Sequence, residues 1–258
     1  MPQMTLIKRV YFKLVNLSWI VLTITTLLLI TTSTVSLTII EPQTFTNHLD
    51  ALWFTMTTML TVGYGDISPV TAGGKIFTII FLFTIGVGLF ATFIGKILDS
   101  LTTYHKKRLR GDIMYTGKNH YVIIDWSHKA ENAVQEIIRR DEKAEIVVID
   151  TMDTLDVENV HYIKGSASNS KVLKKANVAN AIAVIIFADE KIESQMLRDG
   201  KSLMIASAIE RVSSNIHTTV EIELEEHLES FEHINIDKFI LANQTMARII
   251  VDSLGESN

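Results

Sequence analysis

The sequence predicts a membrane-embedded helical domain of two spans, followed by a Rossmann-like α/β domain with a parallel sheet. Two uncharged and mainly apolar runs, residues 14–40 and 76–95, lie in the first half of the chain. The second half alternates short β-branched runs with amphipathic stretches. The first pattern is typical of transmembrane helices and the second of β-α-β units. We therefore expect one domain over residues 1–113 and another over 114–258.

Composition and charge agree with this division. Of the 258 residues, 47% are hydrophobic and 21% are charged, and the mean hydropathy of +0.25 is high for a soluble domain. Residues 1–113 hold nine Lys/Arg and five Asp/Glu, a net charge of +4, whereas the remainder holds fifteen and twenty-four, a net charge of −9. The acidic second half argues against nucleic-acid binding. The absence of cysteine excludes disulfides, thiolate zinc sites and thiol catalysis, and fits a reducing compartment.

The first span is expected over residues 14–40, because these 27 uncharged residues exceed the length of helix needed to cross the hydrocarbon. Its Thr and Ser hydroxyls can bond to carbonyls of their own helix and so cost little in lipid. A signal peptide is the alternative, but the run is too long for an h-region and no small-residue cleavage site is evident. A second uncharged run follows Lys75, and we expect a span over about 76–98.

Basic residues flank the two spans on one side: Lys8, Arg9 and Lys13 before the first, and Lys106, Lys107, Arg108 and Arg110 after the second. The sequence predicts a multi-pass protein of the cell membrane whose spans contact lipid. By the positive-inside rule, both of its termini are expected in the cytoplasm. The intervening loop, residues 41–75, then faces outward. Its centre, residues 49–60, is apolar but too short to cross, which is typical of a re-entrant half-helix buried in protein.

A specific motif follows the predicted half-helix directly: Thr61, Val62, Gly63, Tyr64, Gly65 and Asp66. A cage for dehydrated K⁺ needs successive backbone carbonyls that point at one axis, and Gly63 and Gly65 allow the positive φ values that this requires. A glycine-rich turn without function is the alternative, and the position between two spans argues against it. On these residues the chain resembles the potassium-channel family.

The resemblance implies K⁺ as the permeant ion and a homotetramer, because four copies close the ring of carbonyls. It also implies that Tyr64 packs against Trp53 of a neighbouring half-helix. The sequence departs from the family at Phe54, which replaces a second tryptophan, and at Thr57, where some channels bury a glutamate. We expect selectivity to survive these departures. The chain has no arginine-rich helix and therefore no predicted voltage sensor.

Two glycines, Gly86 and Gly88, lie about midway along the second span. Their spacing resembles the hinge of inner helices in ligand-gated two-span channels, which predicts a bend at Gly86. The alternative is that small residues at these positions only permit close helix packing.

The second half of the chain predicts six strands, over 121–125, 145–150, 160–163, 181–187, 218–222 and 239–242, and helices over 130–140, 169–176, 192–211 and 245–254. This alternation is typical of a doubly wound fold. Behind a two-span domain it resembles the regulator-of-potassium-conductance (RCK) domain, in which a smaller second lobe usually follows. We expect that lobe to be missing here, and the resemblance leaves open whether additional RCK domains join the ring.

The first strand-to-helix turn, residues 125–130, contains no glycine where a dinucleotide-binding turn has G-x-G-x-x-G. Asp125 would repel a pyrophosphate, and the side chains at 125 and 127 would block a close approach. Asp150 occupies the ribose-binding position, although acidic residues often end such strands without a functional role. We therefore assign no cofactor-binding residues, and binding of NAD or ATP is disfavoured.

Three carboxylates, Asp189, Glu221 and Glu223, are expected at the carboxyl edge of the sheet. They match a trio that binds Ca²⁺ in calcium-gated members of the family, although extra residues intervene here. Oxygen ligands without cysteine favour a hard cation such as Ca²⁺. The alternative is a solvated acidic rim, because four further glutamates lie nearby in the sequence: Glu190, Glu225, Glu226 and Glu229.

These expectations combine into a tetrameric, K⁺-selective channel that is gated by a ligand on its RCK ring, with Ca²⁺ as the expected regulator and without enzymatic activity. One alternative is a membrane-tethered, nicotinamide-dependent oxidoreductase, which would need the absent glycine motif and a catalytic domain. Another is a regulatory subunit of a potassium transporter, which would not need residues 61–65.

Overall fold

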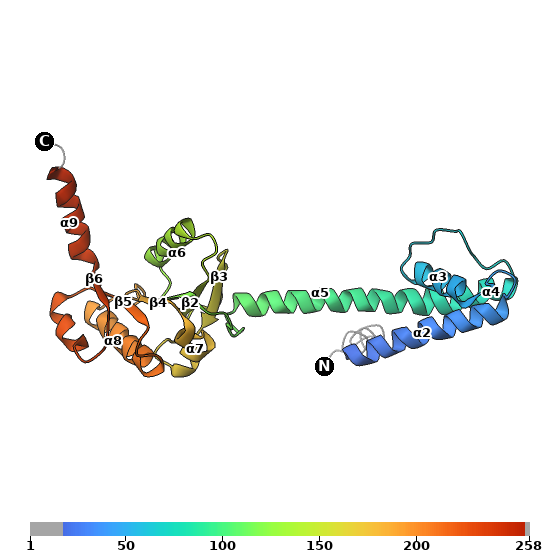
Figure 1. Cartoon of the computed structure of the whole chain (residues 1–258), viewed down its shortest axis with the longest axis horizontal. Helices are drawn as coiled ribbons and strands as arrows, with labels where there is room; N and C mark the ends of the chain where they lie inside the picture. Colours follow the sequence, from blue (N-terminus) through green and yellow to red (C-terminus); the bar gives the residue numbers. More distant parts are fainter. Residues whose placement is uncertain (1–17, 256–258) are drawn as a thin grey trace, which may run out of the picture. The chain divides into compact units, whose positions relative to one another are not determined.

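The computed structural model describes residues 18–255, so residues 14–17 of the predicted first span and the basic residues before them lie outside the described part. The chain divides into two compact units between Thr103 and Tyr104, somewhat before the boundary expected at residue 113. Each unit is described by itself, and Figure 1 labels their elements.

The first unit contains two helical stretches that are long and apolar enough to cross a membrane: α2 (Trp19–Ile40), and a continuous helix from Ala72 to Leu109. Between them lies the shorter α3 (His48–Met59). The Ser18 hydroxyl caps α2 by accepting from the Val21 amide at 3.2 Å. Asn47 caps α3 in the same way, accepting from the Asp50 amide at 2.9 Å. These elements confirm the predicted helical fold class of two spans around a half-helix.

The second long helix is not a uniform α-helix. It consists of α4 (Ala72–Phe77), the π-helical segment η1 (Thr78–Gly86) and α5 (Val87–Leu109). The apolar pattern of the sequence predicted a plain α-helix from about residue 76, because the wider turns of a π-helix leave no separate signal in composition. The start lies earlier than predicted because the Thr71 hydroxyl caps α4 by accepting from the Gly74 amide at 3.1 Å.

The second unit is a six-stranded parallel sheet in the order β3-β2-β1-β4-β5-β6, which confirms the predicted Rossmann-like class. The strands are β1 (Tyr121–Ile124), β2 (Ile146–Asp150), β3 (Val160–Lys164), β4 (Ala183–Ile186), β5 (His217–Ile222) and β6 (Lys238–Leu241). The helices are α6 (His128–Arg140), α7 (Ser170–Lys175), α8 (Gln195–Val212) and α9 (Ala242–Gly255), with short 3₁₀ helices η2 (Val178–Asn180) and η3 (Glu225–Phe231). The order of the strands reverses between β1 and β4, where ligands of such folds bind.

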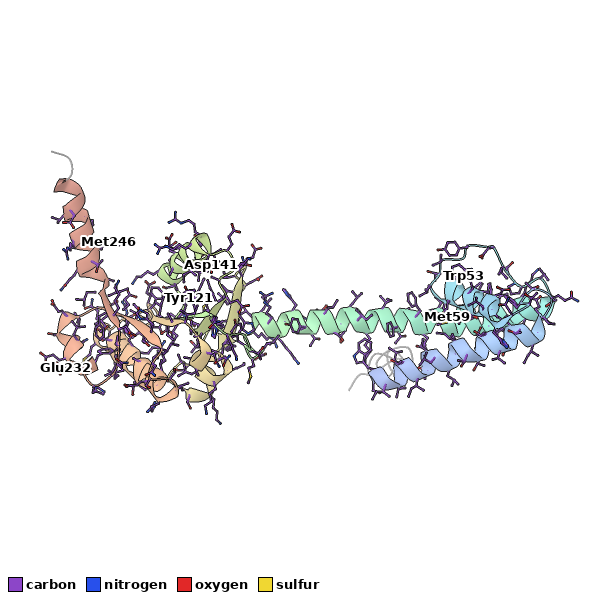
Figure 2. All side chains as sticks on the ribbon, in the orientation of Figure 1. Trp53, Met59, Tyr121, Asp141, Glu232 and Met246 are labelled. Carbon is purple, nitrogen blue, oxygen red and sulfur yellow. The ribbon has the colours of Figure 1, made fainter. Side chains whose placement is uncertain are left out.

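Helices cover both faces of this sheet, and Figure 2 shows the dense side-chain packing around it. Val122 and Ile124 of β1 join the core under α7 and α8, whereas Ile123 joins the core under α6. All three side chains are fully buried. The continuous apolar run of β1 follows from this burial on both faces. The sheet therefore holds the carboxyl ends of its strands as a rigid edge, where the predicted ligand-binding residues lie.

Candidate functional site

The motif at residues 61–66 follows the C-terminal end of α3 and is hydrogen-bonded to it. The Thr57 carbonyl accepts hydrogen bonds from the amides of Val62 at 2.8 Å and Gly63 at 3.3 Å. The Thr58 carbonyl accepts from the Thr61 amide at 3.0 Å. The last carbonyls of a helix have no partner within it, so the following strand satisfies them here. These bonds hold the motif against the half-helix.

The backbone of the motif alternates in hand. Thr61, Gly63 and Gly65 have positive φ values of 58°, 57° and 73°, whereas Val62 and Tyr64 between them do not. This alternation turns successive peptides so that their carbonyls can face one side, as a K⁺ filter requires. A Cβ at Gly63 or Gly65 would meet no atom within 4 Å, so the backbone angle and not space demands glycine there.

The positive φ of Thr61 is a feature that the sequence did not reveal. A non-glycine residue in the left-handed region costs about 1–2 kcal/mol, and a threonine carries no signal for it. The surrounding bonds to α3 hold this conformation in place.

Trp53 supports the motif from behind. Its ring stacks on that of Tyr64 with centroids 5.6 Å apart and planes parallel. Its indole Nε1 donates to Asp66 Oδ2 at 2.8 Å. Both contacts lie within one chain, so α3 and the motif of the same chain face each other, and the packing of Tyr64 on Trp53 of a neighbouring half-helix stays a prediction. Thr57 does not join this network, since its hydroxyl donates to the Trp53 carbonyl at 2.9 Å.

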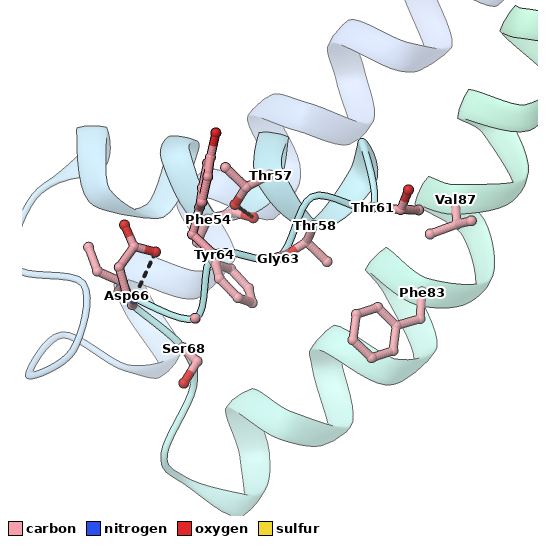
Figure 3. A pocket seen from close by; sticks show the side chains of 12 residues that line it. Phe54, Thr57, Thr58, Thr61, Gly63, Tyr64, Asp66, Ser68, Phe83 and Val87 are labelled. Atoms are coloured by element: carbon pink, nitrogen blue, oxygen red, sulfur yellow. Dashed lines mark hydrogen bonds between the residues drawn. The ribbon is translucent and has the colours of Figure 1, made fainter.

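A hollow of about 380 Å³ adjoins the motif. Thr61, Gly63 and Tyr64 line it together with Phe83 and Val87 of the second long helix. Figure 3 shows Phe83 and Val87 on the part of that helix nearest to the motif. The face of the second long helix that carries Phe83 and Val87 is therefore turned toward the motif.

Glu41 is a second residue whose role the sequence did not reveal. It was assigned to an outward loop, yet it is only 2% exposed. Its carboxylate accepts from the Val70 amide at 2.9 Å and from the Thr71 amide. Gly74 leaves room for it, because a Cβ there would lie 2.8 Å from the Glu41 Cδ. Glu41 thus ties the end of α2 to the loop that follows the motif.

The two predicted hinge glycines have different surroundings. A Cβ at Gly86 would lie 3.1 Å from Met59 Cγ, at the end of α3, and 3.7 Å from a methyl group of Leu29. A Cβ at Gly88 would meet nothing within 4 Å. Gly86 therefore permits close packing, which is the alternative that the sequence left open. A hinge at Gly86 or Gly88 stays a prediction.

At the sheet edge, each of the three predicted metal ligands has a cationic partner. Asp189 binds Lys201 Nζ at 2.7 Å, Glu221 binds Lys129 Nζ at 2.8 Å, and Glu223 binds Arg198 at 2.5 Å. Among residues 18–255, no group of three or more His, Cys, Asp or Glu side chains is placed to hold a metal ion. This conformation therefore does not assemble the three carboxylates, and the Ca²⁺ site stays a prediction.

Further hydrogen bonds hold the Glu221 side chain and the backbone amide of Glu223. Glu221 is buried, and its second oxygen accepts from the Ala188 amide at 2.9 Å. The buried Asp199 of α8 accepts from the Glu223 amide at 3.0 Å and from His227 Nδ1 at 2.7 Å. Asp199 therefore positions the end of β5, a role that its place in a helix did not indicate.

The carboxyl ends of β1 and β4 hold a second network of charged side chains. Asp125, with a φ of 65°, follows β1 and binds Lys201 Nζ at 2.6 Å. Burial raises the pKa of Asp125 to about 6; Lys201 opposes this rise, and the negative charges of Asp189 and Asp150 add to it. Burial also opposes the charge of Lys201, but its two carboxylate partners raise its pKa above the usual range.

Asp150, at the predicted ribose position, is 1% exposed and already occupied by contacts. It accepts from Lys191 Nζ at 2.7 Å, from the Trp126 amide at 2.7 Å and from the Met152 amide at 3.0 Å. Although burial opposes its charge, Lys191 and these amides hold the pKa of Asp150 below its usual range. The Ser127 hydroxyl caps α6 at the Ala130 amide, 3.3 Å away. In this conformation, groups of the protein itself thus satisfy the Asp150 carboxylate.

Comparison with known proteins agrees with both units. A family model described as "Ion channel" matches residues 21–103, and one described as "Calcium-activated potassium channel slowpoke-like RCK domain" matches residues 117–220. The chain therefore resembles the potassium channels that carry an RCK domain. This confirms the resemblance inferred from residues 61–66 and from the alternating strands and helices.

Two curated relatives match most of this chain. The chain is 25% identical over 215 residues to the putative potassium channel protein YugO of Bacillus subtilis, a match to 83% of the chain and 65% of the relative. It is 27% identical over 213 residues to the calcium-gated potassium channel TvoK of Thermoplasma volcanium, covering 81% of the chain and 60% of the relative. The chain thus spans less than two thirds of either relative. Their names describe channels and not enzymes, which supports a non-enzymatic reading at the family level.

Solved structures have a similar fold. The GsuK channel bound to NAD is 17% identical, with a TM-score of 0.55, covering 85% of this chain and 39% of that one. GsuK bound to ADP is 15% identical, with the same TM-score of 0.55, covering 85% of this chain and 57% of that one. At this identity the likeness concerns the fold alone. Because both are described as nucleotide complexes, the expectation that NAD or ATP is disfavoured finds no support in the comparisons.

Proposed function

We propose that this protein is a K⁺-selective channel of the cell membrane, built from four copies and opened through its RCK domains. The alternation of positive φ at residues 61, 63 and 65, in a motif held at the end of a half-helix, is the observation that carries this proposal. In a ring of four such segments, K⁺ exchanges its hydration shell for the carbonyl oxygens of residues 61–64 and moves passively. The C-terminal end of α3 carries partial negative charge, which favours a cation near it.

Selectivity is tested by substituting Gly63. A Cβ there resists the positive φ, so Gly63→Ala is expected to abolish the preference for K⁺ over Na⁺ in bi-ionic reversal potentials. Gly88→Ala is the matched control, because Gly88 lies in open space in a helix and lacks a positive φ. It should keep selectivity. Equal permeability to K⁺ and Na⁺ in the unmodified protein would refute the proposal.

Control by the RCK domain requires a firm link between its sheet and the inner helix. Within the second unit, the end of α5 and the turn after it are hydrogen-bonded to the α/β fold: the Leu155 amide donates to the Leu109 carbonyl at 3.0 Å, and Lys175 Nζ donates to the Gly111 carbonyl at 2.6 Å. The Lys164 amide donates to the same Gly111 carbonyl at 3.2 Å. With both termini cytoplasmic, expansion of an RCK ring would pull on the inner helices through residues 96–112.

Ca²⁺ is the regulator that we propose, acting at Asp189, Glu221 and Glu223. The calcium-gated relative supports this choice, and the carboxylates lie at the edge of the sheet where ligands of this fold bind. Ca²⁺ would have to displace Lys201, Lys129 and Arg198 from these carboxylates. This exchange gives Ca²⁺ different affinities for two arrangements of the edge, as a gating ligand requires.

The test is a Ca²⁺ dose response of open probability in planar bilayers. Asp189→Asn keeps the shape and removes one charge, so its curve is expected to shift to higher Ca²⁺. Glu226→Gln, an exposed glutamate outside the three, is the control and should leave the curve unchanged. Coinciding curves for Asp189→Asn and the parent would show that the regulator binds elsewhere.

A further inference from the structure

The π-helical segment η1 divides the second long helix into two parts with different surroundings. Its wide turns are closed by bonds over five residues, such as that from the Val87 amide to the Leu82 carbonyl. The Thr84 hydroxyl also bonds five residues back, to the Ile79 carbonyl at 3.1 Å. By contrast, the Thr92 hydroxyl in α5 bonds four residues back, to Gly88 at 2.9 Å. The change of period therefore occurs at Gly86.

Below Gly86, α5 has two apolar faces that are offset by one residue. Val87 lines the hollow beside Thr61, and helical spacing from it gives a first face of residues 87, 91, 94 and 98. Beyond Val87 this face, Ala91, Ile94 and Leu98, is exposed in the single chain.

The second face consists of residues 90, 93 and 97, which are half-buried. Phe93 of this face packs edge-on against Trp19 of α2, with ring centroids 5.7 Å apart and planes at 89°. In this conformation the first face is thus turned to the side of the motif and the second toward α2.

A π-turn closes one residue later than an α-turn. If η1 converted to α-helix, the residues below it would turn by about one residue position, ~100°. Residues 90, 93 and 97 would then take the directions that 91, 94 and 98 have here. Phe93 would lose its contact with Trp19. On the side of the helix that faces the motif, the bulky Phe90 would replace the small Ala91.

We propose that η1 is a rotary joint of the inner helix, whose conversion between π and α exchanges these two faces at the pore and thereby opens and closes it. The proposal rests on the proposed function, because it needs the second long helix to line a pore. In the α form, a ring of Phe90 and Phe93 side chains narrows the pore and excludes water, which blocks ions. In the π form, the smaller Ala91 leaves it wider.

Contacts around η1 give this joint two competing arrangements. Met59 against Gly86 and Trp19 against Phe93 stabilise the π form. The α form gains the better hydrogen-bond geometry of the common helix. A glycine hinge would instead bend the helix and keep the same face toward the pore. Rotation and bending therefore predict different accessible residues.

The chain has no cysteine, so single cysteines can be placed without background. We would reconstitute the full chain with a cysteine at 94, 98, 93 or 97 and apply a charged thiol reagent from the cytosolic side. Solutions with Ca²⁺ chelated, Ca²⁺ added, NAD added and ADP added are compared, and open probability is recorded in each. Modification is followed by mass shift, which does not depend on current.

The joint predicts that positions 94 and 98 react at least tenfold faster than 93 and 97 in the solution of highest open probability. The order reverses in the solution of lowest open probability. If the same positions react fastest in both solutions, the proposal is overturned. A parent protein that carries no K⁺ current would instead refute the proposed function, so the two failures are distinguishable.

Deletion of Ile80 provides an independent test. Ile80 lies in η1 and is 61% exposed, and its removal takes one residue out of the wide turns while leaving the face with Ala91 inward. The deletion variant is expected to conduct, to keep one open probability in all four solutions and to show fast modification at 94 and 98 only. Ile80→Ala, which keeps the register, should behave as the parent. A deletion variant that still switches faces would overturn the proposal, and if it fails to fold, the thiol pattern of the undeleted chain decides.

Discussion

Replacing Asp125 by asparagine should stabilise the RCK unit at neutral pH. Asp125 is almost fully buried at the carboxyl end of β1, and burial raises its pKa to about 6 although Lys201 lies 2.6 Å away. Asparagine has nearly the same shape, tolerates the positive φ of 65° better than most residues and mimics the protonated acid. Lys201 keeps its second partner, Asp189, in the variant. The substitution therefore removes a poorly solvated charge without leaving a cation unpaired.

The size of the effect follows from the pKa of Asp125 in the folded and unfolded states. It rises from 3.8 to about 6, and each unit corresponds to about 1.4 kcal/mol, so ionised Asp125 lowers the free energy of unfolding by about 3 kcal/mol. The folded protein binds the proton of Asp125 more tightly than the unfolded chain does. The stability that the protonated side chain contributes is therefore present in full below pH 3.8 and is lost as the pH rises through about 6. At pH 7 Asp125→Asn should gain up to about 3 kcal/mol over the parent, and near pH 4 almost nothing.

The assay is thermal unfolding of the full chain in detergent between pH 4 and pH 8, followed by a signal of the α/β unit. For a unit of this size, about 3 kcal/mol corresponds to a rise in Tm of roughly 6–12 °C at pH 7. Asp153→Asn is the control, since the Asp153 side chain is 96% exposed and should show little change. The reasoning would be refuted if Asp125→Asn were less stable than the parent at pH 7. It would also be refuted if the variant gained the same stability at every pH.

Three further substitutions test contacts in the two units. Glu41→Gln replaces a charged acceptor of two backbone amides by a neutral one, which should cost about 2 kcal/mol and lower the Tm of the membrane unit; an unchanged Tm would contradict the assigned role. Lys191→Ala uncovers Asp150, so calorimetry on the full chain should show tighter binding of NAD or ADP than in the parent, whereas equal binding would mean that Lys191 does not occlude the crevice. Trp53→Phe keeps an aromatic ring but removes the bond to Asp66, and we expect K⁺ current to decay faster during sustained opening with selectivity retained; an unchanged decay would show that this bond does not support the filter.

Local patterns in the sequence determined much of the fold. Uncharged runs located the two spans, and alternation of β-branched and amphipathic segments located all six strands within a few residues. Residues 61–66 predicted a filter motif because its chemistry depends on consecutive backbone units, and glycines at 63 and 65 indicate the positive φ values that the structure shows there. In each case the signal lies within a short stretch of chain and does not require knowledge of what packs against it.

Tertiary structure decided which side chains meet. Glu41 read as an outward loop residue, and only the fold brings the amides of residues 70 and 71 to its carboxylate. The sequence predicted Asp189, Glu221 and Glu223 as metal ligands, and only the fold pairs each of them with a cation from α6 or α8 in this conformation. The facing of those helices is set by core packing between elements far apart in sequence. The wide turns of η1 occur where this helix contacts other helices, for example where Gly86 lies against Met59. No local sequence pattern encodes such a contact.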